Sequence, residues 1–343
     1  MYLGASDVET LSLTIVLFAA PANLVGVYID DEYVEMPELP EVEFTARQLR
    51  ASVVGATISE ARVFWERTIG HPSLPDFLAE VAGRRIEGVR RRGKYLLIDL
   101  SGDLLLSIHR RMTGNFLLLP PGWEIDTSLR EHDPAAWSTK GPTIRMVASN
   151  GTSYSKELLY CRACFLFEDG RCLLFTDPRK FGRIELWPRS QEDAALQGLG
   201  PEPLGADFSP ERFRTALAGR RVTIKQALLD QTLVAGVGNI YADEALFYAN
   251  IHPRRRADSL SQDEATLLQQ GVVSVLTRGI EHGGTSFNDY RDLWGEAGDN
   301  YNHVHVYHQE GKPCSRCGTP IERIVIAQRS THYCPNCQKA TVE

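Results

Sequence analysis

The stretch from which the rest of the chain can be understood is Met36-Pro37-Glu38-Leu39-Pro40-Glu41-Val42-Glu43. A proline directly after a methionine often becomes the first residue once the methionine is removed. The Pro37 nitrogen would then be a secondary amine, whereas an amide nitrogen shares its lone pair with a carbonyl and cannot attack carbon. A free α-amine titrates near pH ~8 and can form an iminium with an aldehyde-level carbon. The alternative is a plain helix start, which also favours proline and acids in its first turn.

A helix is predicted over residues 38–54, because apolar residues recur on one face of that segment and Gly55 follows it. The next segments have the patterns of strands: 57–64, 95–100, 104–108, 161–168 and 172–176. Residues 120–157 are rich in Pro, Gly, Ser, Thr and charge, which predicts a long irregular insertion. Residues 37–188 are therefore expected to form a β-sandwich or barrel with a leading helix.

Helical patterns dominate the second half of the chain, after a joint rich in proline and glycine at residues 198–205. They cover residues 210–218, 223–229, 239–249 and 262–282, and a glycine-rich loop follows at 283–301. We expect an α+β protein with a β-sandwich domain at 36–190, a linker at 191–207, a helical domain at 208–305 and a cysteine module at 306–343. Residues 1–35 are expected to be a leader outside the fold, either an over-extended reading frame or a disordered segment.

The formal net charge of −7 is unevenly distributed along the chain. Residues 1–35 carry six acids and no Lys or Arg, so residues 36–343 have a net charge of −1. Basic residues cluster at 90–94, 109–111, 179–183 and 252–256, which suggests one positively charged face, although solvated runs of charge are also common. The apolar segment 11–29 lacks a basic flank and is interrupted by proline and asparagine, so we expect no membrane association.

The strongest motif is Cys314-x2-Cys317-x16-Cys334-x2-Cys337. Four thiolates at this spacing predict one tetrahedral, structural Zn²⁺ ion on two knuckles and a reducing compartment. Between the two pairs, Arg329 is expected at the tip of a β-ribbon, either as solvated surface or as a phosphate contact. The remaining cysteines lack a fourth ligand and are expected to be buried, inert thiols: Cys161, Cys164 and Cys172.

Residues 234–242 bring glycines to a helix start, with Asn239 predicted as the cap. Free backbone amides at such a start bind anions, and Lys225 lies on the preceding helix. Phosphate binding is the favoured reading, and a helix-turn-helix corner without a ligand is the alternative.

The turn at residues 177–182 carries Arg179 and Phe181, a cation and an exposed ring that could fill the gap left by an extruded base. Met112 follows a predicted strand and could be a second wedge. The alternative is an ordinary exposed turn. Taken alone, Lys94 at a predicted strand start is expected to be a solvated lysine.

Taken together and in this order, the motifs resemble the formamidopyrimidine-DNA glycosylase (Fpg/Nei) family over residues 36–343. The run Leu39-Pro40-Glu41-Val42-Glu43 is similar to the Fpg branch rather than to endonuclease VIII relatives. The resemblance implies a two-domain monomer that clamps damaged double-stranded DNA, with a helix–two-turn–helix and a zinc finger on the C-terminal side. It also implies a cytoplasmic, nucleoid-associated enzyme of base excision repair.

The resemblance implies a role for each matching residue. Pro37 is the nucleophile, Glu38 the proton donor, Lys94 the lysine of β-elimination and Arg329 the arginine of δ-elimination. The residues implied to contact DNA are Met112, Arg179, Phe181, Lys225, Asn239, Arg221 at the position of a family lysine, and Tyr160 at the position of a family histidine. The departures are this Tyr160, Lys180 in place of a second arginine, and Arg110 and Arg111 before the Met112 wedge.

The expected function is therefore a bifunctional DNA glycosylase and AP lyase that excises oxidised purines, with the loop at 283–301 folding over the everted base. One alternative is a related glycosylase for oxidised pyrimidines. Another is a catalytically silent protein that binds damaged DNA, if the leader is retained and Pro37 stays an amide.

Overall fold

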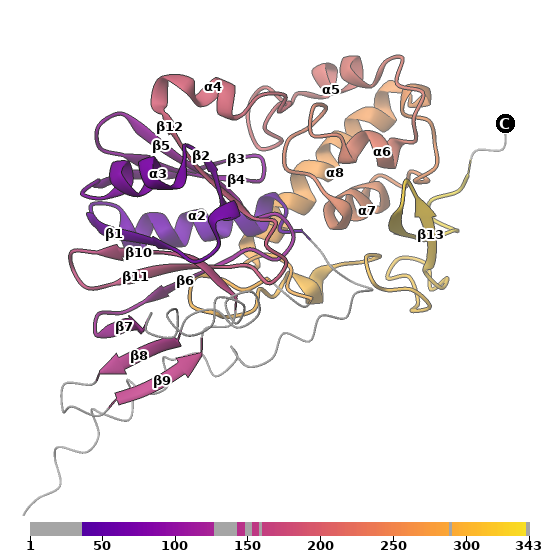
Figure 1. Ribbon diagram of the computed structural model, residues 1–343. Helices are drawn as coiled ribbons and strands as arrows, with labels where there is room; N and C mark the ends of the chain where they lie inside the picture. The colour runs from indigo at the N-terminus through magenta and orange to yellow at the C-terminus, as the bar shows by residue number, and fades with distance from the viewer. Residues whose placement is uncertain (1–35, 127–142, 148–152, 158–159, 288–289, 341–343) are drawn as a thin grey trace, which may run out of the picture.

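The computed structural model describes residues 36–126, 143–147, 153–157, 160–287 and 290–340 (Figure 1). Helix α2 (Leu39–Val53) lies at the centre of the N-terminal domain, between two sheets. Its buried residues recur at the spacing of one helix face, which the sequence predicted, and Gly55 follows with φ +90°. The apolar side chains of α2 and of both sheets form one core, so the sandwich is built around this helix.

Both sheets contain strands from distant parts of the chain. The first is antiparallel, in the order β1 (Ile58–Val63), β10 (Cys161–Phe167), β11 (Cys172–Thr176) and β6 (Asn115–Leu119). The second has the order β2 (Ile69–His71), β12 (Arg183–Pro188), β5 (Leu104–His109), β4 (Tyr95–Leu100) and β3 (Ile86–Arg92), with only β2 and β12 parallel. The predicted hairpin is the pair β4–β5, whose turn has two residues at positive φ, Gly102 and Asp103.

The expectation of an irregular insertion at residues 120–157 is wrong for its described parts. They form a separate antiparallel sheet of β7 (Trp123–Asp126), β8 (Thr143–Val147) and β9 (Ser153–Glu157). The remaining residues of this segment, like residues 1–35, lie outside the described part of the chain. The first domain also contains the short helices α3 (Leu74–Val81) and α4 (Glu192–Ala195) and the 3-10 turns Glu66–Thr68 and Arg189–Gln191.

The second domain is helical and has a core of its own. It contains α5 (Pro210–Leu217), α6 (Ile224–Leu229), α7 (Asn239–Tyr248) and α8 (Gln262–Glu281), with 3-10 turns at Ala257–Ser259 and Asn300–His303. The ribbon β13 (Glu322–Ile326) and β14 (Arg329–Tyr333) lies against α7 at the far end of the molecule. The α+β fold class, with its N-terminal sandwich, helical domain and ribbon, is confirmed. Among the described residues, no helix is long and apolar enough to cross a bilayer.

The first residues of α2 join the two domains. Leu39 belongs to the core of the helical domain, although the rest of its helix packs into the sandwich. Its backbone N–H donates to the carbonyl of Gly236 (3.0 Å), and a side chain at Gly236 would overlap Leu39. The stretch at residues 36–43 therefore docks between the domains.

The arginine run at residues 90–92 is a structural element and not part of an open positive face. The Arg91 side chain is 7% exposed and pairs with Glu43 (3.0 Å) and with Glu202 of the linker (2.8 Å). Its neighbours are paired in the same way, with the partners Asp99, Glu192 and Glu202. These ion pairs fasten the sheet to the linker, which leaves fewer cations available for a ligand than the sequence suggested.

Candidate active site

Glu38 lies at the start of helix α7, although 200 residues separate them in the sequence. Its two carboxyl oxygens accept hydrogen bonds from the backbone N–H groups of Gly238 (2.6 Å) and Ile240 (2.9 Å). A side chain at Gly238 would overlap this carboxyl group. Two sequence expectations are thereby corrected: the cap is Gly238 and Asn239 is the first helical residue, and the helix start holds a carboxyl group of the protein itself.

Glu41 fixes Glu38 from the other side. One Glu41 oxygen accepts the backbone N–H of Glu38 (2.8 Å), which is the capping box of α2. The other accepts from the Tyr241 hydroxyl (2.7 Å) and from the backbone N–H of Thr285 (2.7 Å). The Glu41 carboxylate therefore joins Glu38, α7 and the start of the glycine-rich loop through hydrogen bonds.

The four residues expected to be catalytic come from distant segments. Pro37 and Glu38 are buried, and Lys94 is buried at the turn before β4. Arg329 is exposed at the tip of the ribbon, close enough for its charge to act on Lys94. The fold thus brings the N-terminal octamer, a strand turn of the sandwich and the zinc ribbon to one place.

Burial controls the protonation of this cluster. Burial raises the pKa of Glu38 to about 7, against the opposing charge of Lys94 and the two N–H groups of α7. Burial also lowers the pKa of Lys94, since Glu38 and Glu41 only partly offset its loss of hydration. A carboxyl group that keeps its proton near neutral pH, beside an amine that releases its proton more readily, can serve as a general acid and base pair.

The two predicted wedges are tied together by Asp177, which no sequence pattern marked as a site residue. Its carboxylate accepts from the backbone N–H of Gly182 (2.6 Å) and from the hydroxyl of Thr113, next to Met112. Phe181 is 48% exposed. The Arg179 guanidinium lies 5.4 Å from the Phe181 ring centre. Met112 and Tyr160 are half-exposed nearby, the latter at φ +68°.

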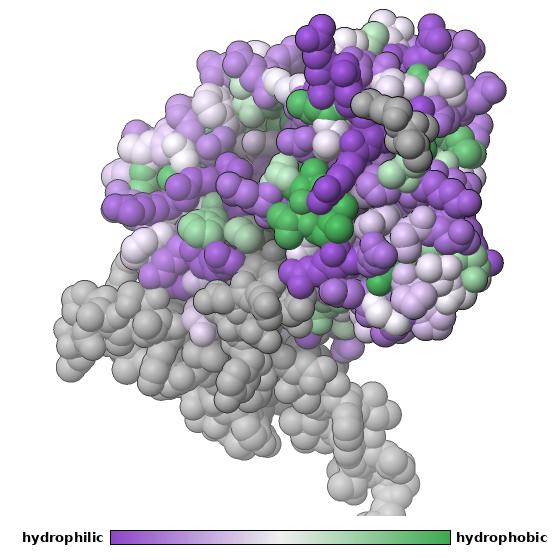
Figure 2. Space-filling model, turned by 90° about the vertical axis from the view of Figure 1, so that its right-hand side faces the viewer, coloured by the Kyte–Doolittle hydropathy of each residue, from purple (hydrophilic) through white to green (hydrophobic). Residues whose placement is uncertain are grey.

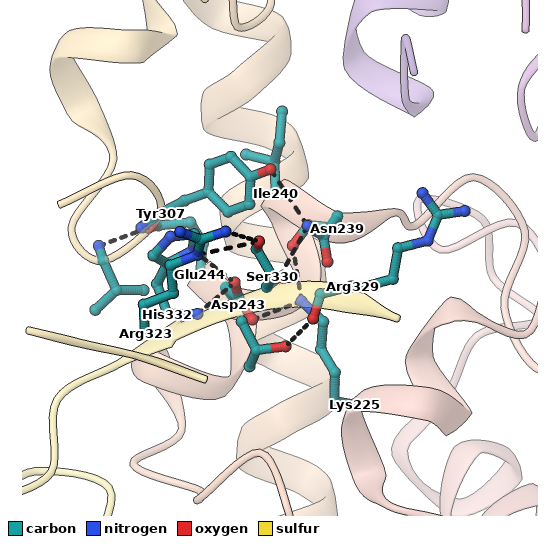
Figure 3. A network of polar contacts seen from close by, with 12 residues as sticks. Lys225, Asn239, Ile240, Asp243, Glu244, Tyr307, Arg323, Arg329, Ser330 and His332 are labelled. Carbon is teal, nitrogen blue, oxygen red and sulfur yellow. Dashed lines mark hydrogen bonds and ion pairs between the residues drawn. The ribbon is translucent and has the colours of Figure 1, made fainter. Parts of the chain in front are cut away.

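The expected DNA contacts of the helical domain differ in accessibility, and Figure 3 shows two of them, Lys225 and Asn239. Arg221 is exposed, whereas Lys225 is fully buried and pairs with Asp243 (2.5 Å). Asn239 is half-buried, and its amide donates to the Ser330 carbonyl (3.0 Å) and to the hydroxyl of Tyr307 (3.2 Å). Tyr307 was not predicted, and only its position in space, beside Asn239, marks it as part of the site.

The four ribbon cysteines fit one zinc ion. Sulfurs about 2.3 Å from a tetrahedral zinc are about 3.8 Å apart. Two of the sulfur–sulfur distances are 3.9 Å (Cys314–Cys337) and 3.5 Å (Cys317–Cys334), and all four atoms lie within 4.8 Å of one another. With four protein ligands the site is closed, so its zinc is structural. The three other cysteines are buried in a small apolar cluster of the sandwich.

The surface on the ribbon side of the molecule is mostly hydrophilic, with one compact apolar group near its centre (Figure 2). Among the described residues, the large apolar side chains that are exposed include Phe181, Trp294 and Tyr301. Trp294 and Tyr301 belong to the glycine-rich loop at 283–301, and Phe181 to the wedge turn.

Three family models match the chain. They are the formamidopyrimidine-DNA glycosylase N-terminal domain at residues 36–184, the H2TH domain of the same glycosylase at 199–291, and a zinc finger found in FPG and IleRS at 311–340. The formamidopyrimidine-DNA glycosylase of Herpetosiphon aurantiacus is 43% identical over 304 residues, which cover 88% of this chain and all of that protein. The enzyme of the same name from Enterococcus faecalis is 41% identical over 306 residues, 89% of this chain and 98% of that protein.

Solved structures agree with these relatives. A Lactococcus lactis Fpg variant in complex with DNA containing Fapy-dG has a TM-score of 0.74 and 34% identity, covering 89% of this chain and 100% of that one. The L. lactis Fpg complex with DNA containing an abasic site has a TM-score of 0.74 and 33% identity, covering 88% and 100%. Because the matches run through the sandwich, the helical domain and the ribbon, the chain belongs to the formamidopyrimidine-DNA glycosylase family.

Proposed function

We propose that the protein is a bifunctional DNA glycosylase and AP lyase of base excision repair, which removes oxidised purines through an iminium on Pro37. The observation that carries this proposal is the carboxyl group of Glu38, held next to Pro37 by the N–H groups of α7 and with a pKa near neutrality. The L. lactis relatives, solved with Fapy-dG and abasic-site DNA, support the substrate class. Family membership supports the glycosylase activity.

The damaged nucleotide must leave the base stack before its glycosidic bond can be reached, which costs a few kcal/mol. We propose that Phe181, Arg179 and Met112 enter the duplex and offset this cost by filling the gap. Their two loops are joined through Asp177 and can therefore enter the duplex as one unit. Arg221 and Asn239 are proposed to contact the phosphate backbone, with Tyr160 on the sandwich side.

In the reaction, the neutral Pro37 nitrogen attacks the anomeric carbon, and the base departs with the electrons of the glycosidic bond. The attacking nitrogen loses its N–H proton, which neutralises the departing base, and thereby regains its lone pair. Glu38 donates its proton to the ring oxygen as the sugar opens, and the nitrogen lone pair forms the iminium. Loss of a proton from the neighbouring carbon expels the 3′ phosphate, and we propose that Lys94 accepts that proton. A second elimination, assisted by the Arg329 charge, expels the 5′ phosphate and leaves a one-nucleotide gap. The zinc ion supplies only the fold of the ribbon.

This mechanism requires a free amine at Pro37, so we propose that the active form begins there. A chain that keeps residues 1–35 has an amide at Pro37 and would bind damaged DNA without reacting. We also propose that the protein acts as a monomer in the cytoplasm, associated with the nucleoid. We further propose domain limits of 36–190, 208–305 and 306–343, and the family models matched at 36–184, 199–291 and 311–340 support them.

A panel of duplexes with single lesions tests the substrate class, using a chain that begins at Pro37. We expect excision of 8-oxoguanine and formamidopyrimidines to be faster than excision of thymine glycol or 5-hydroxyuracil, and every product to carry phosphates on both sides of the gap. Preferential removal of the pyrimidine lesions would favour the endonuclease VIII-like alternative. Binding to the lesions without excision of any of them would favour the silent damage-binding protein.

A further inference from the structure

Lys225 is enclosed by the helical domain and does not face solvent. Its side chain is 0% exposed, and its ammonium group donates to the Asp243 carboxylate (2.5 Å) and to the Asn239 carbonyl (3.0 Å). The partner carboxylate of Asp243 is also 0% exposed. To reach a phosphate, Lys225 would have to leave the buried Asp243 carboxylate without its lysine partner, which is strongly unfavourable.

Asp243 has a second partner, on the zinc ribbon. Its other carboxylate oxygen accepts the backbone N–H of His332 in β14 (2.9 Å). One helical turn earlier, the Asn239 amide donates to the carbonyl of Ser330 in the same strand (3.0 Å). Figure 3 shows both side chains reaching from α7 to β14, with the Lys225 ammonium group meeting Asp243 and Asn239.

The contacts of Asn239 and Asp243 with β14 can form at the same time because the helix and the strand have similar spacings between the residues involved. Residues four apart on a helix are about 6.0 Å apart along its axis, and residues two apart in a strand are about 6.7 Å apart. The carbonyl of Ser330 and the N–H of His332 lie on the edge of β14 away from β13 in this two-stranded ribbon. Side chains of α7 thus form hydrogen bonds with backbone groups on the free edge of β14. A shift of the ribbon by one residue would break both contacts.

The anchored strand begins at Arg329, directly before Ser330. The same helix holds the Glu38 carboxyl group at its first turn. A second anchor lies beside Asp243, since Glu244 accepts the backbone N–H groups of residues 305–307 (2.8–3.1 Å), which lead into the ribbon. Helix α7 is therefore the common support of the proton donor and of the ribbon arginine.

We propose that Asp243 and Lys225 are positioning residues that fix the zinc ribbon in register on α7 and thereby place Arg329 at the active site, and that Lys225 makes no phosphate contact. Lys225 acts by orienting the Asp243 carboxylate toward β14. This inference rests on the proposed lyase reaction only for the role of Arg329. This inference replaces the sequence prediction that Lys225 contacts a phosphate or the lesion.

The test compares K225M, D243L and the double variant K225M/D243L with the wild type, in the zinc-loaded chain that begins at Pro37. The two single variants leave one charge buried and can fold poorly, whereas the double variant removes both charges and keeps an apolar core of similar volume. Zinc content and thermal melting identify the folded variants. D263N, at an exposed acid in the first turn of α8, is the matched control for a change of charge.

Two measurements separate positioning from phosphate contact. The first is the salt dependence of binding to an abasic-site duplex. The slope of log K against log salt is negative, and loss of one phosphate contact reduces its magnitude by about 0.9. The second is the ratio of β- to β,δ-elimination product, because δ-elimination depends on Arg329. R221M, which removes an exposed cation, should show the change in slope expected of a phosphate contact.

We expect K225M and the double variant to keep the wild-type slope and the wild-type rate of hydride trapping, but to slow δ-elimination by about 100-fold, the effect of a displacement of about 1 Å. D263N should match the wild type in all respects. If the magnitude of the salt slope fell by about 0.9 in K225M while the product ratio stayed unchanged, the inference would be overturned. Should the wild type show no lyase activity, the proposed function fails, and the salt slope alone still decides whether Lys225 contacts phosphate.

Discussion

The setting of Glu38 predicts how the formation of the iminium depends on pH. Burial raises the pKa of Glu38 to about 7 from its usual 4.5. At pH 7 about half of the Glu38 side chains then carry the proton, against about 0.3% for a carboxyl group with the usual pKa. The fold therefore increases the acid form at neutral pH about 150-fold, which corresponds to about 3 kcal/mol.

Two titrations set the rate, because Glu38 must be protonated and the Pro37 amine must be neutral. The amine titrates near pH ~8, and in its reactive, neutral form it adds no charge beside Glu38. Below pH ~7 the rate should rise about tenfold per pH unit as the amine loses its proton. From about 7 to about 8, further loss of amine protons is balanced by loss of the Glu38 proton, and above about 8 the rate should fall about tenfold per unit.

Single-turnover trapping with cyanoborohydride on an abasic-site duplex, from about pH 5 to about pH 9.5, measures this profile. The E38Q variant has no proton to lose at this position, so its residual rate should reach a plateau above about pH 8 without the alkaline fall. If Glu38 had its usual pKa, the wild-type rate would be level from about pH 5 to about pH 8. Such a level profile would refute the reasoning from burial.

Three further predictions concern the parts of the protein that support this site. Glu202→Gln should lower the free energy of unfolding, measured by urea denaturation, by about 2 kcal/mol, because it removes one of the two carboxylates that pair with Arg91; a smaller salt slope of DNA binding in R91M would contradict the structural role of the arginine run. Phe181→Ala should change stability by less than about 0.5 kcal/mol, since the ring is exposed, yet slow base excision more than trapping at an abasic site; equal slowing of both reactions would count against the wedge. Removal of zinc by a chelator should unfold the ribbon and abolish the δ-elimination product while the circular dichroism of the sheets persists; a zinc-free protein with full β,δ-cleavage would contradict the placement of Arg329 by the ribbon.

Local sequence patterns predicted the elements whose burial repeats regularly. The leading helix shows the helical spacing of Val42, Leu49 and Val53, and the β4–β5 hairpin has continuous apolar strands around a glycine turn. The zinc ribbon was predictable because metal geometry fixes the spacing of its ligands. The insertion strands β7–β9 were missed because their composition resembles a loop. Strand β3 was missed because its two buried residues, Ile86 and Val89, are three apart across a bulge and do not alternate as in a regular strand.

Contacts between distant segments could not be predicted from local patterns. The sequence indicated that the start of α7 binds an anion, but did not indicate that the anion is Glu38, 200 residues earlier. In the same way, the sequence showed Lys225 as a cation near a helix start, and only the fold reveals that Asp243 and the ribbon enclose it. The partners of such groups are set by packing between domains and not by their neighbours in the sequence.

The most direct test of the proposed mechanism is to locate the covalent adduct. The chain beginning at Pro37 and the chain carrying residues 1–35 are each trapped with borohydride on an abasic-site duplex, digested with protease and nuclease, and analysed by tandem mass spectrometry. We predict a sugar-derived mass on the nitrogen of Pro37 in the first chain and no trapped product from the second. An adduct on Lys94 or another lysine, or equal trapping by the longer chain, would contradict the assignment of Pro37 as the nucleophile.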